Sequence, residues 1–190
     1  MRTTISWRHL LDQAIEQHAH LPQARFMQLA TIRRDGRPAN RTLAFRGWLE
    51  PEECLLFTAD LRSAKVGQLG AWSWAEACWY FTETREQFRL LGQISVGTDA
   101  TGGDLAAARA RCWQEATDAT RQSFTWPQPG EARAAPAAFD QPPPANPPAD
   151  FGILVLLPTE VEYLDLRARP HLRRLSRRVD HAWTDVVVNP

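Results

Sequence analysis

The sequence carries no excess of charge of either sign, because 22 lysine and arginine residues balance 22 aspartate and glutamate residues. Nucleic-acid-binding proteins usually carry a basic surface, so this balance argues against nucleic acid as the main partner. Cysteine is scarce as well, and Cys54, Cys78 and Cys112 form no C-x-x-C pair. This spacing argues against a disulfide framework and a structural zinc site, and it fits a protein of the reducing cytoplasm.

Long apolar runs are also missing. The N-terminal stretch MRTTISWRHLLDQ turns polar within a few residues, and no segment approaches the roughly 20 apolar residues of a membrane-spanning helix. We therefore expect a soluble, unsecreted protein without a membrane partner. No serine lies in a G-x-S-x-G motif, no carboxylate pair stands out, and we expect His18 and His20 on the surface. A bound cofactor is therefore the better candidate for any chemistry.

The first half of the chain has the pattern of an antiparallel β protein. Apolar residues recur at helical spacing behind Ser6, a good N-cap, and predict a short amphipathic helix. The pair Asp35-Gly36 predicts a two-residue hairpin turn, and DLRSAKVGQLGAW predicts a short helix. Strands are predicted for the segments RFMQLATIRR, PANRTLAFRGW, CLLFTA, AEACWYFTE and QFRLLGQISV.

The second half mixes a helix, a proline-rich segment and further strands. Residues 103–124 are rich in alanine and predict one helix of several turns. Residues 126–150 are too rich in proline for regular hydrogen bonding and predict an extended loop, either a lid or a passive surface excursion. Strands are predicted for GILVLLP, EVEYLDL and AWTDVVVNP, the last behind the basic stretch RARPHLRRLSRR. The 190 residues predict one mainly β domain, a six- to eight-stranded antiparallel barrel with two or three flanking helices.

The polar residues that could bind a ligand fall into three clusters. They are Arg41 with Arg46; Thr58, Arg62, Ser63 and Lys65; and Arg169, His171 and Arg173. The second cluster favours a phosphate site, since cationic groups at a helix start can join its free N–H groups, although a solvated loop would look the same. The members of the first cluster face opposite sides of a regular strand, so one ligand reaches both only at a bulge, a strand end or a contact between chains. The third cluster shares one face if it is extended, and its alternative is an exposed basic strand.

Several short segments occur in an order and at spacings that resemble a known family. They are FMQLATIRRDGRPANRTLAFRGW, FTADLRSAK, REQFRLLG, RQSFTWP and RPHLRRL followed by W and NP. Together they resemble the pyridoxamine 5'-phosphate oxidase family of flavin-binding split barrels, over nearly the whole chain. The oxidase-related FMN-binding branch, which carries W-P-x-P-G as at residues 126–130, is the most similar. The resemblance implies a split β-barrel and a homodimer that holds FMN in a cleft between its subunits.

The resemblance also implies roles for individual residues. Arg41, Thr42, Leu43 and Arg46 would meet the flavin, with Arg41 on its phosphate. Arg46, Arg169 and His171 would contact the substrate. Further cofactor contacts would come from Phe57, Thr58, Arg62, Ser63, Lys65, Gln87, Arg173 and, across the dimer, Gln122 and Ser123.

The sequence departs from the family oxidase at several of its ligand positions. Arg46 stands where the oxidase has a lysine, and the flavin-contacting tryptophan of the family falls on Tyr163 or Leu164. Residues 100–150 contain no tyrosine, although the oxidase binds its substrate phosphate there through Tyr, Arg and Ser. The arginines that could substitute are Arg109, Arg111 and Arg121.

The implied function is that of an FMN-dependent oxidoreductase similar to the oxidases of pyridoxal phosphate metabolism. The substrate, pyridoxamine or pyridoxine 5'-phosphate, would yield a hydride to the flavin, and O₂ would reoxidise the flavin to give peroxide. A flavin reductase on the same barrel is the enzymatic alternative. A protein that binds FMN or haem without turnover is the other, with His171 the one histidine in a matched motif.

Overall fold

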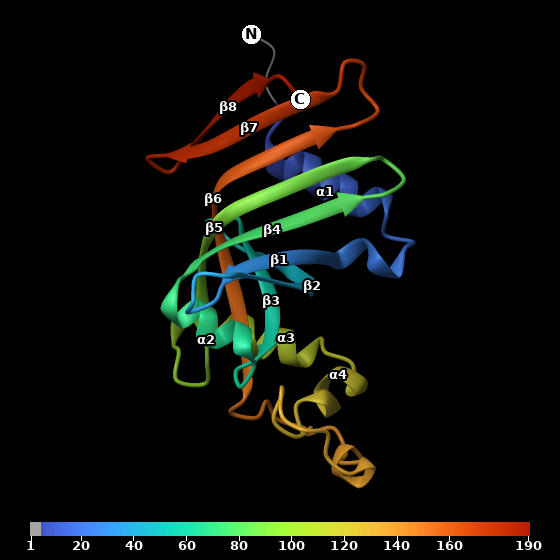
Figure 1. The fold of residues 1–190 in the computed structure, drawn as a ribbon, viewed down its shortest axis with the longest axis vertical. Helices are drawn as coiled ribbons and strands as arrows, with labels where there is room; N and C mark the ends of the chain where they lie inside the picture. Colours follow the sequence, from blue (N-terminus) through green and yellow to red (C-terminus); the bar gives the residue numbers. More distant parts are fainter. Residues whose placement is uncertain (1–4) are drawn as a thin grey trace.

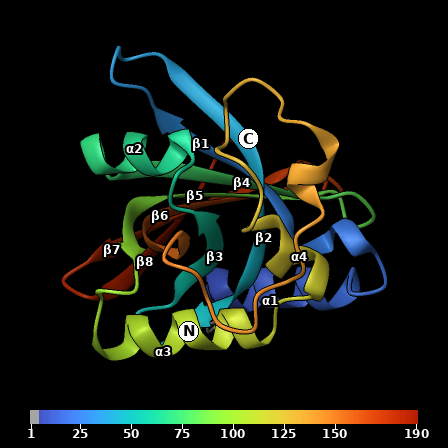
Figure 2. The same ribbon diagram turned by 90° about the horizontal axis from the view of Figure 1, so that it is seen from below.

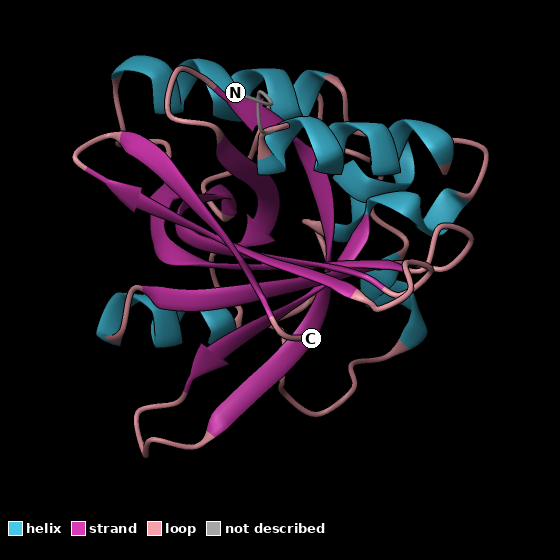
Figure 3. Ribbon diagram, turned by 90° about the horizontal axis from the view of Figure 1, so that it is seen from above, coloured by secondary structure: helices cyan, strands magenta, loops and turns pink. Residues whose placement is uncertain are grey.

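The computed structural model describes residues 5–190, which form an eight-stranded antiparallel sheet with helices on its outside (Figure 1). The strand order is β3-β2-β1-β4-β5-β6-β7-β8, and an additional β3–β6 pairing closes the first six strands of that order into a barrel. The mainly β barrel predicted from the sequence is therefore confirmed. Seen from above, the strands curl around a central core with the helices outside them (Figure 3).

The helices and strands mostly follow the predicted order along the chain, but a strand over Leu172–Val179 occupies the basic stretch for which none was predicted. The helices are α1 (Trp7–Gln17), α2 (Ala64–Ala71), α3 (Gly103–Gln114) and α4 (Asp118–Ser123), with the 3-10 turns η1 (Pro22–Arg25) and η2 (Pro136–Phe139). The strands are β1 (Phe26–Ile32), β2 (Pro38–Leu49), β3 (Cys54–Asp60), β4 (Trp74–Phe81), β5 (Glu86–Gly97), β6 (Phe151–Asp165), β7 (Leu172–Val179) and β8 (Ala182–Val188). None of the helices in the described part of the chain is long and apolar enough to cross a membrane.

Strand β6 holds the barrel and its extension together, and the prediction of two separate strands here was wrong. Its first half pairs with β3 and its second half with β7, while β5 runs along its other edge. Pro158 lies where the partner changes from β3 to β7, so its missing N–H interrupts no ladder on that edge. The β5–β6 register shifts at the same point, opposite Gly92, where a Cβ would lie 2.0 Å from the carbonyl oxygen of Leu157. One continuous, bulged strand therefore replaces the predicted break.

One turn and one helix also differ from their predictions. The β1–β2 hairpin closes with hydrogen bonds from Arg33 N to Arg37 O and from Gly36 N to Arg33 O, so its loop is longer than the predicted two-residue turn. Gly36 has φ +81°, which is why glycine is needed there. The predicted helix over residues 103–124 is divided into α3 and α4, because the Thr117 side chain accepts a hydrogen bond from Thr120 N and starts a new helix.

The barrel core is aromatic, and α1 closes one side of it. Trp7 and Leu11 of α1 are buried, and the Trp7 ring packs against Trp48 and Trp183. The prediction that His18 lies on the surface was wrong, since only 2% of it is exposed. Its Nδ1 lies 2.8 Å from the Ala14 carbonyl and its Nε2 accepts a hydrogen bond from the N–H of Glu83 at 3.1 Å.

A second apolar layer covers the outside of β3 and β6. It joins Cys112 and Trp113 of α3 and Phe124 behind α4 to Phe151 and Ile153 of β6. Seen from below, α3, α4 and the 126–150 loop all lie at the end of the barrel where β3 runs into α2 (Figure 2). Strands β7 and β8 project at the opposite end (Figure 1).

Candidate functional site

The turn from β3 into α2 places a hydroxyl and an ammonium at the start of a helix. Ser63 is the N-cap residue of α2, but its side chain caps no helical N–H. Instead, Ser63 Oγ donates to the Asp60 carbonyl oxygen at 2.5 Å and accepts from Lys65 Nζ at 2.8 Å. The first N–H groups of a helix have no intrahelical partner. Free backbone donors and the Lys65 ammonium therefore lie together, an arrangement that suits a phosphate.

Lys65 and Arg41 are partly buried cations that repel each other. Burial and the nearby Arg41 charge lower the pKa of Lys65, while Asp60 opposes this shift. Burial also lowers the pKa of Arg41. A dianion placed between two such groups would remove their repulsion and compensate for their lost hydration. We name Arg41, Ser63, Lys65 and the start of α2 the phosphate cradle.

Arg41 is held in place by β1 and α2. Its Nη1 donates to Leu29 O at 3.0 Å and to Thr31 Oγ1 at 2.6 Å, and its Nη2 donates to Gln68 Oε1 at 2.9 Å. The Thr31 hydroxyl in turn donates to Gln68 Oε1 at 2.7 Å. Thr31 and Gln68 were missed in the sequence, because nothing in their local pattern shows that a strand and a helix meet at Arg41.

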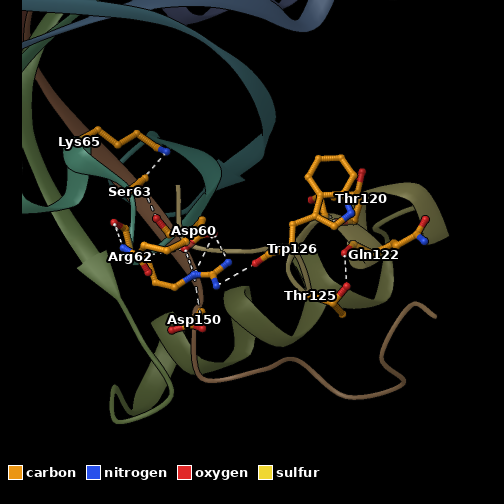
Figure 4. A network of polar contacts seen from close by, with 11 residues as sticks. Asp60, Arg62, Ser63, Lys65, Thr120, Gln122, Thr125, Trp126 and Asp150 are labelled. Atoms are coloured by element: carbon orange, nitrogen blue, oxygen red, sulfur yellow. Dashed lines mark hydrogen bonds and ion pairs between the residues drawn. The ribbon is translucent and has the colours of Figure 1, made fainter. Parts of the chain in front are cut away.

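Arg62 neutralises an acidic residue beside the cradle and ties down the proline-rich loop (Figure 4). Its Nε and Nη2 donate to the Asp60 carboxylate at 2.9 and 2.6 Å, its Nε lies 3.5 Å from Asp150, and its Nη1 donates to Trp126 O at 3.1 Å. Burial opposes the charge of Asp60, but its hydrogen bonds to Arg62 outweigh burial and lower the pKa of this carboxyl. Asp60 was also missed in the sequence, although the Asp-x-Arg spacing that forms the pair is visible there. Without Arg62, a free carboxylate would lie near Lys65.

Arg46 and Thr58 line a different cavity, of about 250 Å³. The β2–β3 register shifts between Phe45 and Trp48, so Arg46 lies in a β-bulge next to Gly47, which has φ +117°. A bulge re-aims the side chains that follow it. Arg41 is not among the residues that line this cavity. The complete lining is Arg25, Arg46, Thr58, Cys112, Glu115, Ala116 and Thr120.

The arginines expected to replace the substrate-phosphate ligands of the family do not line this cavity. Arg109 donates to Phe151 O at 2.8 Å and to Pro148 O at 3.0 Å. Arg111 and Arg121 likewise donate to main-chain carbonyl oxygens. Arg109 and Arg111 thus fix α3 to the barrel and to the end of the proline-rich loop, while Arg121 fixes α4 to the end of α3.

Gln122 and Ser123 of α4 face the proline-rich loop. Gln122 Nε2 donates to Gln141 O at 2.9 Å, and Ser123 Oγ donates to Thr120 O at 2.7 Å. Ser123 also lines a cavity of about 410 Å³ that the loop encloses with Asp60, and its wall includes the rings of Trp126 and Phe139. The loop is therefore anchored to the body of the protein at the cradle end of the barrel.

The remaining predicted residues lie at the other end of the barrel. Gln87 pairs with Leu164, which pairs with Arg173, so the three share one row of the sheet. Arg173 Nη2 donates to Glu162 at 2.8 Å. Leu164, rather than Tyr163, lies on the face of Gln87 and Arg173, because Tyr163 is buried in the barrel core.

Arg169 and His171 lie in the turn before β7 rather than on a regular strand. Their side chains are nevertheless adjacent, with Arg169 Nη1 3.2 Å from His171 Nδ1. Both follow directly on the strand end that carries Leu164, so they belong to the Gln87 end of the barrel.

In one chain this group and Asp60, beside the phosphate cradle, lie at opposite ends of β6. Asp60, next to the cradle, pairs with Phe151 at the start of β6, whereas Gln87 pairs with Leu164 near its end. At the rise of an extended strand, roughly 40 Å of strand lies between these two pairs along β6. Arg41 of the cradle is nearer to Gln87, because it shares a sheet row with Leu90, three residues from Gln87.

The central β2 and β3 positions differ in what they can offer a ligand. Phe57 is fully buried in the barrel, between Phe45 of β2 and Leu154 of β6, so its side chain does not face a ligand. Leu43 packs against the same core, whereas Thr42 is exposed on the outer face.

The family described as "Pyridoxamine 5'-phosphate oxidase, FMN-binding domain" matches residues 4–98. The pyridoxine/pyridoxamine 5'-phosphate oxidase 2 of Arabidopsis thaliana is 35% identical over 192 residues, covering 97% of this chain and 96% of that protein. The pyridoxine/pyridoxamine 5'-phosphate oxidase of Myxococcus xanthus (strain DK1622) is 28% identical, with 95% of this chain and 88% of that protein covered.

Solved structures show the same similarity. A pyridoxamine 5'-phosphate oxidase-related, FMN binding protein from Nostoc punctiforme PCC 73102 superposes with a TM-score of 0.93 at 42% identity. The superposition covers 99% of this chain and 100% of that one. PhzG from Burkholderia lata 383 superposes with a TM-score of 0.81 at 20% identity, covering 100% of this chain and 95% of that one, which shows a shared fold.

Proposed function

Because the chain belongs to the FMN-binding pyridoxamine 5'-phosphate oxidase family, we propose that it is an FMN-dependent oxidoreductase acting on pyridoxamine or pyridoxine 5'-phosphate. Bound FMN supplies the two-electron chemistry for which the chain offers no nucleophile or carboxylate pair. The protein then has to bind the cofactor, orient the substrate against it and exclude competing reactions.

The phosphate cradle is the observation that carries the proposal. Lys65 is bonded to Ser63 at the start of α2 and Arg41 to Gln68 of the same helix, and a phosphate bound there would relieve the repulsion between the two cations. Ser63 keeps Lys65 at the helix start through a 2.8 Å hydrogen bond. The residues present therefore fit the phosphate of FMN, with Arg62 holding the neighbouring Asp60 carboxylate neutralised.

We further propose that a second copy of the chain completes the site. Gln87, Arg173, Arg169 and His171 lie at the end of β6 away from Asp60 and the start of α2, so we assign them to the site that the partner's cradle completes. The outer face of β1 and β4 supports this assembly, because large apolar side chains are exposed there. They are Phe26, Ile32, Trp74 and Tyr80, each at least 40% exposed.

The experiment is to purify the protein and record its absorbance spectrum, its mass in solution and its peroxide release. Flavin bands, a dimeric mass and peroxide formed from pyridoxamine or pyridoxine 5'-phosphate are expected. Flavin reduction by a nicotinamide without oxidation of either phosphate ester would identify a reductase instead. A Soret band in place of the flavin bands would contradict the proposal.

We also propose that the protein works in the cytoplasm, in pyridoxal phosphate metabolism. Cys54, Cys78 and Cys112 are free thiols. Burial, with a contribution from Glu50, raises the pKa of Cys54 to about 11, so this thiol stays protonated and unreactive. Fractionation of cells that express the protein at natural levels tests the location.

A further inference from the structure

The cavity that holds Arg46 brings together residues from distant parts of the chain. Arg25 comes from the end of η1, Arg46 from the bulge of β2, and Thr58 from β3, while Glu115 and Thr120 come from the α3–α4 region. Its walls therefore carry two guanidinium groups and two hydroxyl groups. The sequence offered no reason to connect Arg25 with Arg46.

The pairing of β1 with β2 places these two arginines at the same end of the hairpin. Phe26 at the start of β1 is opposite Ala44 of β2. Arg25 immediately precedes Phe26, and Arg46 lies just beyond Ala44, so both stand at the same end of the hairpin ladder. The bulge at Arg46 and Gly47 then turns Arg46 toward α3. The Arg46 charge acts on Cys112 of α3, because it opposes the rise that burial causes in the pKa of that thiol. This effect agrees with an Arg46 side chain that points toward α3.

Neither guanidinium has a counter-ion among residues 5–190, since no carboxylate oxygen lies within 4.0 Å of Arg25 or Arg46. Other barrel arginines are paired: Arg89 with Glu76 and Arg173 with Glu162. Glu115 lines the same cavity without forming an ion pair to either guanidinium.

Arg25 also lines a second hollow, whose carboxylates are the other candidates for an ion pair with it. That hollow, along α1, is lined by Asp12 and Glu16, but neither forms an ion pair with Arg25. Asp12 instead accepts hydrogen bonds from Arg8 at 2.9 Å and from Trp48 Nε1 at 3.0 Å. Arg25 is exposed at the rim of both hollows, and it shares the first cavity with Arg46.

We propose that Arg25 is a specificity-determining residue that, together with Arg46, binds the phosphate monoester of the substrate. This inference rests on the proposed function and names the group that its site recognises. Two guanidinium groups match the charge and the several acceptor oxygens of a phosphate, and the Thr58 and Thr120 hydroxyls can donate to the remaining oxygens. The nearby Glu115 carboxylate opposes the anion and weakens its binding.

The cavity is separate from the phosphate cradle, so the two phosphates are bound by different residues. Arg41, Ser63 and Lys65 do not line it, and Arg25 makes no contact with the cradle side chains. Changes at Arg25 should therefore affect the substrate and leave FMN affinity unchanged.

The test compares the Arg25→Gln holoprotein with the wild type and with Arg34→Gln, which removes one charge from the exposed β1–β2 loop. Equilibrium binding of pyridoxal 5'-phosphate and of pyridoxal, its phosphate-free analogue, is measured with FMN bound. We expect Arg25→Gln to weaken the phosphate ester by about ten- to one-hundred-fold, the usual effect of losing a charge-assisted hydrogen bond, and to leave pyridoxal unchanged. Arg25→Lys should recover part of the loss, and Glu115→Gln should tighten the phosphate ester.

The outcomes separate this inference from the proposed function. Wild-type preference for the phosphate ester that survives intact in Arg25→Gln would overturn the role of Arg25 and leave the proposed function standing. A wild type that binds FMN but shows no preference for the phosphate ester would overturn both. Unfolding temperature and FMN affinity, measured for every variant, show whether a loss comes from the fold, and an equal loss for pyridoxal would also count against the role.

Discussion

Lys65 is the only lysine in the sequence, and replacing it gives the sharpest test of the phosphate cradle. In Lys65→Met the methionine keeps most of the apolar stem and removes the ammonium that Ser63 holds at the start of α2. A hydrogen bond to a charged group contributes about 1.5 to 3 kcal/mol. The dissociation constant of FMN should therefore rise roughly ten- to one-hundred-fold.

Riboflavin provides the internal control, because it has the same ring system without the phosphate. Titration of the apoprotein, followed by quenching of flavin fluorescence, should show that Lys65→Met loses affinity for FMN and keeps its affinity for riboflavin. Lys65→Arg should retain most of the FMN affinity, since it keeps a charged donor. An equal loss of both flavins would refute the reasoning, because Lys65 would then act on the ring site or on the fold.

The pH dependence gives a second readout of the same contact. Burial and the Arg41 charge lower the pKa of Lys65 below its ordinary 10.5. As the pH rises through that lowered pKa the ammonium loses its charge, so FMN affinity of the wild type should fall while riboflavin affinity stays level. Lys65→Arg should show no such fall, because arginine remains charged. Acylation of Lys65, followed by mass spectrometry, should be slowed by bound FMN.

Three further substitutions test other parts of the structure. Arg62→Ala should speed hydrogen exchange across residues 126–150 and weaken FMN binding several-fold, because it releases both loop contacts and leaves a carboxylate unneutralised near the cradle; unchanged exchange would contradict the anchoring role. Gly92→Ala should lower the free energy of unfolding by about 2 kcal/mol or more in urea titrations, since its Cβ would meet a carbonyl oxygen of β6 at 2.0 Å. Gly67→Ala, where nothing lies within 4 Å, is the matched control and should not destabilise. Trp74→Glu, on the exposed face of β4, should give a monomer in sedimentation analysis and release flavin; a dimer that retains its flavin would contradict the proposed assembly.

Local sequence was enough for most of the elements and for the phosphate cradle. Alternating apolar positions predicted the strands, and Ser6 predicted the start of the first helix because its side chain accepts a hydrogen bond from His9 N. The run of Ser63 and Lys65 at a strand-to-helix turn predicted an anion site, since both residues and the helix start lie close together in the chain. The family resemblance then implies that this anion is the phosphate of FMN.

Features that depend on contacts between distant segments could not be predicted in this way. The sequence around Pro158 reads as the end of a strand, yet β6 continues because its partner changes there from β3 to β7. His18 reads as a surface residue at a helix end, yet the turn after β4 covers it and Glu83 N donates to its ring. In both cases the deciding partner lies far away along the chain.

The sequence by itself determined the order of elements, the family and the cationic start of α2, because each depends on residues that are neighbours in the chain. Tertiary structure alone decided that Arg25 and Arg46 share a cavity, that Arg62 bonds both Asp60 and the proline-rich loop, and that Asp60 and Gln87 pair with opposite ends of β6. The physical reason is that strand register, a β-bulge and barrel closure set which side chains meet, and these are fixed only when the whole sheet forms.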